Sequence, residues 1–389
     1  MKVESLLSFT CPVKMNSGNK VLEGLPFELA GLNAAKPLIL ASPNDTPPKA
    51  IKILLSAFGN SKMTFGLFDG IDEAEDLGTI EYLKNICQKD RYDALIALGG
   101  RAADAAKVLN MTVSYKLPDA RLLTAETTIN KPLGPLVVAI TAGATGLETS
   151  SLAHFGNRVY RSEYLAPSLA VIDPRLAVSQ DAAAMACSGL AAFARAVEAH
   201  GAVPENPFRR AYSFAAIRFI LENLPAAVSN PGNRKAALAV ANAAAMSGCA
   251  LADGGNTGLH KIGQAFSGTG RGPAGMIMAM ALPYMLNDYK VNGGFDLAAL
   301  LHPLADDDTF AKTPESERAD AATDIANRFV SGLQKTAGKA LPRTLKETGL
   351  PGYLLEDLLE TLDADPDGAR LRSVARRMWD GVSPDAKKG

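Results

Sequence analysis

Residues 93–107 read Asp93-Ala-Leu-Ile-Ala-Leu98-Gly99-Gly100-Arg101-Ala-Ala-Asp104-Ala-Ala-Lys107. The apolar run at the start predicts a strand that is buried on both faces. The alanine-rich stretch after the two glycines predicts a helix. Glycines at such a turn let backbone amides at the helix N-terminus approach an anion, which makes the segment a candidate phosphate site. Ordinary strand-to-helix turns also carry two glycines, and the segment alone does not separate the two interpretations.

Further apolar runs lie on both sides of this segment and alternate with helical stretches. They are Lys36–Ala41, Met63–Phe68, Leu136–Thr141 and Leu169–Asp173. Continuous apolar strands separated by helices are typical of a parallel sheet that is covered on both faces. We therefore expect the N-terminal part to be a doubly wound, Rossmann-like α/β domain.

The composition changes after Asp173-Pro174. Residues 181–200 and 235–252 are rich in alanine, which has the highest helix propensity, and contain few β-branched residues. We therefore expect two domains, an α/β domain over residues 1–180 and an all-helical domain over residues 181–389.

The charge balance excludes several classes of partner. The chain carries 40 Lys and Arg against 41 Asp and Glu, which argues against binding to nucleic acid or to an anionic membrane. The four cysteines are scattered, without the spacing of metal ligands. We find neither a secretory signal nor an apolar run of about 18 residues, so we expect a cytoplasmic protein with reduced thiols.

A second glycine-containing loop follows a predicted strand. It reads Thr141-Ala-Gly-Ala-Thr-Gly-Leu-Glu148 and combines hydroxyl groups with glycines. A tight turn with capping hydroxyls would have the same composition. Two such loops at the ends of parallel strands are more informative than one, because open α/β sheets bind ligands at that edge.

These segments resemble the iron-containing alcohol dehydrogenase family, which shares its fold with dehydroquinate synthase. The GGGSxxDxAK loop of the family resembles residues 98–107, and its PTTAGTGSE loop resembles residues 140–148. A family strand resembles Pro167–Pro174, and a later family segment resembles Ser247–His260. The resemblance covers nearly the whole chain and implies a dehydroquinate synthase-like fold, with a dinucleotide-binding α/β domain before a helical one.

The resemblance also implies which residues hold a dinucleotide. Gly99, Gly100 and Asp104 would line the pyrophosphate, while Thr141 and Thr145 would lie beside the nicotinamide and its ribose. The first loop departs from the family, because Leu98 replaces its first glycine and Arg101 replaces its usual serine. Arg101 would either add a cation to the phosphates or crowd the turn.

The cofactor preference stays open between NAD and NADP. Relatives that prefer NAD often carry an aspartate after the first strand, where this chain has Ser42. An acidic group there binds the ribose hydroxyls and repels a 2′-phosphate, so its absence permits NADP. Asp45 is close enough in the sequence to take over that role.

The resemblance fails at the metal site. The positions that correspond to the family's four ligands are Ala191, Arg195, His260 and Ala274. A catalytic ion needs about three protein ligands, and one imidazole cannot hold it. We therefore expect no bound iron or zinc.

A metal-free enzyme would need another electrophile. Arg195 is a candidate to polarise a carbonyl or to bind a substrate carboxylate, and His260 is a candidate proton donor. Alternatively, Arg195 only fills the former metal site by pairing with Glu198 or another carboxylate, with His260 hydrogen-bonded beside it. Among the other histidines, His154 follows the second loop and is a weaker candidate for the ligand site.

Two functions follow from these features. The first is an NAD(P)-dependent oxidoreductase that transfers a hydride between the nicotinamide and a small alcohol, aldehyde or oxo-acid without a bound metal. The alternative is a non-catalytic nucleotide-binding or regulatory relative that has lost dehydrogenase activity. The family commonly forms homodimers through its N-terminal segment, and Leu6–Val13 is apolar enough to serve as an edge strand in such a dimer.

Overall fold

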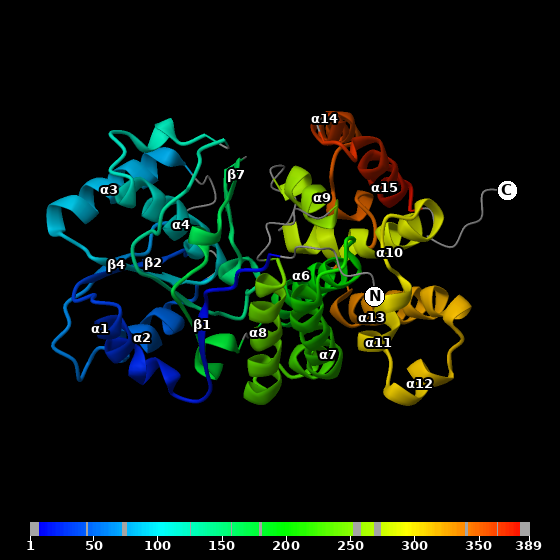
Figure 1. Ribbon diagram of the computed structural model, residues 1–389, viewed down its shortest axis with the longest axis horizontal. Coiled ribbons are helices and arrows are strands. Elements are labelled where there is room, and N and C mark those ends of the chain that lie inside the picture. Colours follow the sequence, from blue (N-terminus) through cyan, green and yellow to red (C-terminus); the bar gives the residue numbers. More distant parts are fainter. Residues whose placement is uncertain are drawn as a thin grey trace. The chain divides into compact units, whose positions relative to one another are not determined.

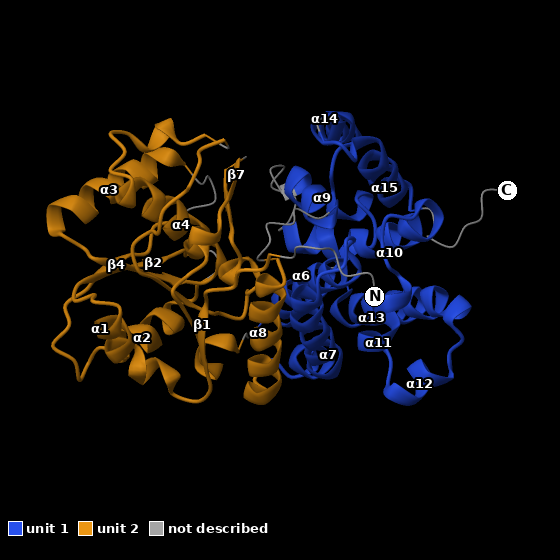
Figure 2. Ribbon diagram, in the orientation of Figure 1, with its two compact units in different colours: residues 1–7, 181–231, 255–389 blue, residues 8–180, 232–254 orange. Residues whose placement is uncertain are grey.

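The chain forms two compact units, which Figure 2 shows in different colours. The computed structural model describes residues 8–43, 46–71, 76–124, 126–156, 158–178, 181–251, 258–267, 274–338, 341–363 and 365–381. The α/β unit consists of Ser8–Gln180 together with Gly232–Gly254. The helical unit contains Asp181–Pro231 and Gly255–Gly389.

A six-stranded parallel sheet forms the centre of the α/β unit (Figure 1). In sheet order its strands are β1 (Lys14–Ser17), β8 (Leu169–Ile172), β5 (Leu136–Ala139), β4 (Ala94–Leu98), β2 (Pro37–Ala41) and β3 (Gly66–Phe68). The strands predicted from apolar runs are confirmed, and the chain switches direction in the sheet between β2 and β4. Ligands of open α/β sheets bind at such a switch point.

Helices cover both faces of this sheet, which explains why its strands are apolar throughout. Successive side chains of a strand point to opposite faces. Ile39, Ile96 and Val137 belong to one buried cluster with α1 (Leu25–Gly31) and α2 (Pro48–Ser56). On the other face α4 (Gly100–Ser114) contacts β2, β4 and β5, and α3 (Leu77–Asp90) packs against α4.

The N-terminal edge of the sheet differs from the expectation. Residues 8–13 form no strand, and the edge strand is β1, which pairs with β8 from Lys14 to Ser17. Its sequence, KMNS, is polar and partly exposed, so it lacks the apolar signal of the inner strands. The remainder of the predicted segment Leu6–Val13 lies outside the described residues.

One segment after residue 180 does not belong to the helical unit in which we expected it. Helix α8 (Arg234–Cys249) belongs to the α/β unit, where it contacts β8, α5 (Pro174–Ala177) and the short helix η3 (Leu147–Thr149). A Cβ atom on Gly248 would lie 1.8 Å from the carbonyl oxygen of Gly146, so only glycine permits this approach. The Thr149 hydroxyl also donates to the Ala245 carbonyl at 2.7 Å.

The helical unit is built around α6 (Ala182–Gly201), which packs against α7 (Pro207–Ser229), α9 (Gly258–Ser267) and α10 (Ala274–Asn292). Its other helices are α11 (Leu301–Leu304), α12 (Asp307–Lys312), α13 (Arg318–Ala337), α14 (Gly352–Asp363) and α15 (Gly368–Asp380). Asp181 caps α6 by accepting the amides of Ala183 and Ala184.

Among the described residues, α6 is the helix whose length and composition would allow it to cross a membrane. However, 78% of its most apolar window is buried inside the structure, as in the core helix of a globular domain.

Candidate functional site

The first candidate site lies at the carboxyl ends of β2, β4 and β5. Ala41 is in register with Leu98, and Leu98 is in register with Ala139, so the segments that follow these strands emerge side by side. The Thr46 hydroxyl donates to the Leu98 carbonyl at 2.9 Å and ties the loop after β2 to the end of β4. The predicted residues Ser42, Gly99, Gly100 and Thr141 all follow these three strands, at the same edge of the sheet.

The turn between β4 and α4 requires its glycines. Gly99 has a φ of 90°, a conformation that side chains disfavour. A Cβ atom on Gly100 would lie 2.9 Å from an Oε1 atom of Glu148, which comes from the second loop. The two glycine-containing loops therefore meet at Glu148, and both predicted loops contribute to one site.

Glu148 shapes the second loop from within. Its side chain is 1% exposed and accepts the amides of Thr145 at 3.1 Å and Gly146 at 2.8 Å. The predicted residue Thr145 is thus held through its backbone. A carboxylate that accepts two backbone amides fixes the loop more firmly than a neutral acceptor would.

Lys107 holds the far side of the same loop. Its fully buried ammonium group donates to the carbonyls of Leu147, Ser150 and Leu152 at 2.7, 3.0 and 2.6 Å. Burial lowers the pKa of Lys107 to about 8, although Asp104 and Glu148 oppose the shift. This role of Lys107 was not predicted, and its signal in the sequence is a lysine on the buried face of the helix after the glycine turn.

Two buried hydroxyl groups lack partners at this edge. Ser42 is completely buried and Thr141 is 3% exposed, yet neither side-chain oxygen has a hydrogen-bond partner among the residues that the structure describes. Leaving a buried polar group unsatisfied costs about 1–3 kcal/mol. A ligand with polar groups at the ends of β2 and β5 would satisfy both oxygens, so these residues fit a dinucleotide.

The remaining predicted cofactor residues lie on α4. Arg101 is half-buried in the first turn of the helix, where the positive end of its dipole lies. Asp104 lies one turn further along, and its carboxylate accepts the backbone amide of His154 at 3.0 Å. Asp104 therefore contacts the hairpin of β6 (Leu152–Phe155) and β7 (Arg158–Arg161), which our sequence analysis missed. Asp45 lies outside the described residues.

The second candidate site lies in the helical unit, where Arg195 of α6 and His260 of α9 are 1% and 3% exposed. Glu198, one turn after Arg195, connects these helices. Its Oε1 atom accepts the amide of Leu259 at 2.9 Å and the hydroxyl of Tyr289 at 3.3 Å. Burial, together with the Glu198 carboxylate, raises the pKa of Tyr289. The residue before His260 is thus fixed to α6 one turn from Arg195.

The donor set of this site does not fit a divalent metal. Ala191 and Ala274 offer no ligand atom, and Arg195 brings a cation. In the described part of the chain no three His, Cys, Asp or Glu residues are close enough together to hold an ion. A metal site needs about three such ligands.

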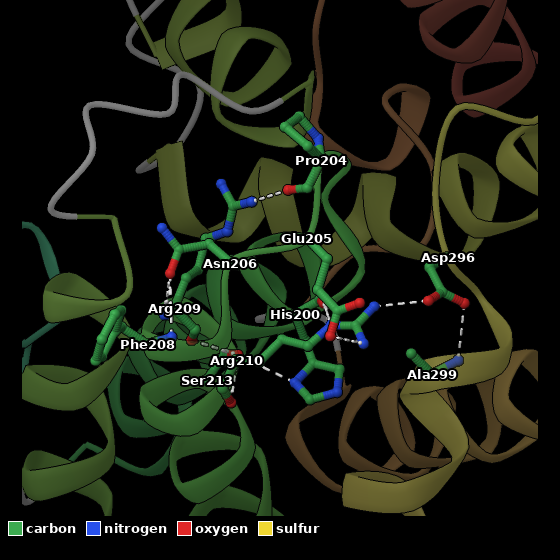
Figure 3. A network of polar contacts seen from close by, with 10 residues as sticks. All are labelled: His200, Pro204, Glu205, Asn206, Phe208, Arg209, Arg210, Ser213, Asp296 and Ala299. Atoms are coloured by element: carbon green, nitrogen blue, oxygen red, sulfur yellow. Dashed lines mark hydrogen bonds and ion pairs between the residues drawn. The ribbon is translucent and has the colours of Figure 1, made fainter. Parts of the chain in front are cut away.

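His200 and His302 serve a different place in the helical unit. The Nδ1 atom of His200 lies 3.1 Å from the Ser213 hydroxyl, and Arg210 pairs with Glu205 and Asp296 (Figure 3). Burial and the nearby Arg210 lower the pKa of His200 to about 4, so the imidazole is neutral. His302 stacks on Phe310 with a centroid distance of 4.6 Å. Both histidines line a cavity of about 500 Å³.

The sequences of both units match models of one protein family. Residues 12–174 match the family described as iron-containing alcohol dehydrogenase, and residues 185–338 match the C-terminal part of the Fe-containing alcohol dehydrogenase family.

Individual relatives agree with this match. The chain is 25% identical to long-chain-alcohol dehydrogenase 1 of Geobacillus thermodenitrificans, over 91% of this chain and 89% of the relative. It is 27% identical to the NAD-dependent methanol dehydrogenase of Bacillus methanolicus, over 69% and 68%. A solved 1,3-propanediol oxidoreductase superposes with a TM-score of 0.83 at 20% identity, covering 96% of this chain and all of that one.

Proposed function

Because the chain belongs to the iron-containing alcohol dehydrogenase family, a family of oxidoreductases, we propose that it is an NAD(P)-dependent oxidoreductase that works without a divalent metal. It would transfer a hydride between the nicotinamide and a small alcohol, aldehyde or oxo-acid. The observation that carries the proposal is a pair of buried hydroxyls, Ser42 and Thr141, that have no hydrogen-bond partner in the described part of the chain and lie on either side of the Gly99–Gly100 turn.

The α/β unit would bind the dinucleotide. The turn at Gly99 and Gly100 would receive the pyrophosphate at the N-terminus of α4, with Arg101 adding a cation. The hydroxyls of Ser42 and Thr141 would donate to ribose and amide oxygens. The bound nicotinamide supplies or accepts the hydride. We expect NAD as the cofactor because the related methanol dehydrogenase is NAD-dependent. Position 42 holds a serine instead of an acidic residue, so NADP is also allowed.

Arg195 and His260 would supply the electrophile and the proton donor in place of a metal ion. A buried guanidinium is a fixed cation that can bind a carbonyl oxygen and stabilise the negative charge that develops there. His260 would donate the proton that this oxygen receives during reduction. Glu198 would hold α9, and therefore His260, against α6.

The test has two stages. NADH and NADPH are first titrated against the protein while nicotinamide fluorescence is followed, and we expect saturable binding of at least one. Turnover is then measured with alcohols, aldehydes and oxo-acids, with and without a chelator, and we expect activity that the chelator does not change. Binding without turnover on any substrate would favour the alternative, a non-catalytic nucleotide-binding relative. A stoichiometric iron or zinc ion in the purified protein would refute the metal-free mechanism.

We further propose a homodimer that uses the exposed side of β1, since β1 lies at the edge of the sheet. Light scattering after gel filtration tests this. The amides of Lys14 and Gly18 donate to β8, so the amide of Met15 points to the open edge, and replacing Met15 with proline should then shift the protein towards monomer.

A further inference from the structure

The helical unit contains a second cavity, separate from the one beside His200. Its volume is about 450 Å³, and it is lined by residues of α10, of α13 and of the segment that follows α13. Met280, Pro283 and Tyr284 of α10 give it an apolar side, and the residues from α13 are polar or charged. No step of the proposed dehydrogenase reaction uses any of these residues.

Asn327 of α13 brings an unsatisfied polar group to this cavity. Its Oδ1 atom is buried, yet it has no hydrogen-bond partner among the residues that the structure describes. The neighbouring core positions of the helix, Ala326 and Val330, are completely buried and apolar, so Asn327 lies where the core meets the cavity. A buried acceptor without a partner costs stability, and such groups are few in folded proteins. A ligand with a hydrogen-bond donor would satisfy this oxygen.

Two arginines at the same cavity are available to a ligand. Within the described ranges of the chain, the guanidinium groups of Arg328 and Arg343 form neither an ion pair nor a hydrogen bond. The four arginines of α15, by contrast, all pair with acidic side chains. Asp324 is the acidic residue of the lining, so the arginines outnumber it by two to one. This balance favours an anionic ligand.

The segment that carries Arg343 is fixed by its backbone on both sides of this residue. The Gln334 side chain, which also lines the cavity, donates to the Pro342 carbonyl at 3.3 Å. The amide of Arg343 itself donates to the Glu347 carboxylate at 2.8 Å, and the amide of Leu345 donates to the backbone of α15 at 3.1 Å. The Arg343 side chain therefore starts from a fixed point beside α13.

We propose that this cavity binds a small anion that carries a hydroxyl group, such as a hydroxycarboxylate or a sugar phosphate. The two guanidinium groups donate hydrogen bonds to its acid group, for which their planar geometry is suited. The Oδ1 atom of Asn327 accepts the hydrogen bond of its hydroxyl group. The carbon skeleton lies against Met280, Pro283 and Tyr284. The volume of the cavity lies within the usual range for small-molecule sites.

Isothermal titration calorimetry of the full chain, without any nicotinamide cofactor, tests this site independently of the proposed function. Gluconate and glucose 6-phosphate are the probes. Glucose lacks the acid group, whereas acetate and inorganic phosphate lack a hydroxylated carbon skeleton. We expect at least one probe to bind at one site per chain, at least tenfold more tightly than these three compounds, and the tighter probe identifies the acid group as carboxylate or phosphate. No saturable binding of either probe, or equally tight binding of inorganic phosphate, would overturn the proposal.

Variants assign the bound probe to this cavity. Asn327→Leu removes the acceptor at similar volume, Arg343→Gln removes an exposed cation, and each should raise the Kd at least tenfold. Lys335→Gln is the matched control, because it removes an exposed cation of the same helix away from the cavity, and its Kd should stay within about twofold. Thermal unfolding checks that each variant folds. An unchanged Kd in both Asn327→Leu and Arg343→Gln, with binding lost in Arg195→Gln, would place the probe at the other candidate site and refute the assignment.

Discussion

At the scale of single residues, His200 is a neutral imidazole enclosed by protein. It is 5% exposed, its Nδ1 atom contacts the Ser213 hydroxyl, and Arg210, Asp296 and His302 are the charged or titratable groups around it. Its pKa in the folded protein, about 4, is lower than the 6.5 of an unperturbed histidine. The unfolded chain therefore binds more protons between these two values, and the folded state loses stability as the pH falls through that window.

We expect this residue to produce a measurable dependence on pH. Between pH 6.5 and pH 4 the free energy of unfolding of the unaltered protein should fall by roughly 3 kcal/mol more than that of His200→Gln. Urea titrations at several pH values provide the measurement. His302→Gln is the control, because His302 is exposed, and it should keep the slope of the unaltered protein. Equal slopes for His200→Gln and the unaltered protein would show that His200 is not buried as described.

Arg195 allows a second prediction at this scale. If its guanidinium binds the reacting oxygen, Arg195→Gln should lower kcat/KM by about 100-fold or more, because a buried cation strongly stabilises the negative charge of the transition state. The dissociation constant of the cofactor should stay within about twofold, and Arg195→Lys should recover part of the loss.

A matched control distinguishes a catalytic role of Arg195 from one in which its side chain only fills the former metal site. Lys261→Gln removes a cation of the same region that pairs with Asp365 at 2.7 Å, and it should leave kcat/KM nearly unchanged. Steady-state kinetics with thermal unfolding as a folding check supply the data. A fully folded Arg195→Gln with normal kcat/KM would assign Arg195 to the alternative, in which it only occupies the former metal position.

At the scale of elements, helix α8 is attached to the α/β unit through glycine. A Cβ atom on Gly248 would lie 1.8 Å from the backbone oxygen of Gly146, a severe overlap, and backbone cannot move aside as a side chain can. Gly248→Ala should therefore lower the free energy of unfolding by about 3 kcal/mol or more. Gly143→Ala, in the neighbouring loop, has open space for its methyl group and should change stability by less than about 0.5 kcal/mol. Similar denaturant midpoints for the two variants would contradict the close contact.

The sequence predicted most elements of the sheet because its inner strands are buried on both faces. Strands such as β4 and β5 are then apolar at every position, which is a strong signal. The edge strand β1 and the β6–β7 hairpin carry mixed side chains and escaped notice. The attachment of α8 also could not be predicted, since its alanine-rich sequence resembles that of α6 and its partner surface depends on Gly146.

The candidate site was predictable to a similar degree. Ser42, Gly99, Gly100 and Thr141 were assigned through a family resemblance, and the structure brings them to one edge of the sheet. The buried interactions of Glu148 and Lys107 were not predicted. Those of Lys107 join residues 40 to 45 positions apart, and such pairings follow from the packing of α4 against the loop rather than from any local pattern.

At the scale of the whole molecule, ligand binding should appear as added stability. A ligand that binds only the folded protein stabilises it by about 4 kcal/mol at a concentration 1,000 times its dissociation constant. We therefore expect saturating NADH or NADPH to raise the unfolding temperature. Zinc or iron(II) at matched concentration, and removal of metals with a chelator, should leave it unchanged. Calorimetry checks both, and a rise with metal that the chelator reverses would refute the metal-free site.

The path of the chain has a consequence for how the protein is made. The chain leaves the α/β unit after residue 180, builds α6 and α7, and returns with α8 before it leaves again after residue 254. When only the first 180 residues have emerged from the ribosome, every strand of the sheet has therefore been made, but helix α8, which covers part of the sheet, has not. The apolar surface next to β8, on which α8 packs, therefore stays exposed and accessible to chaperones until the chain has been translated beyond Gly254.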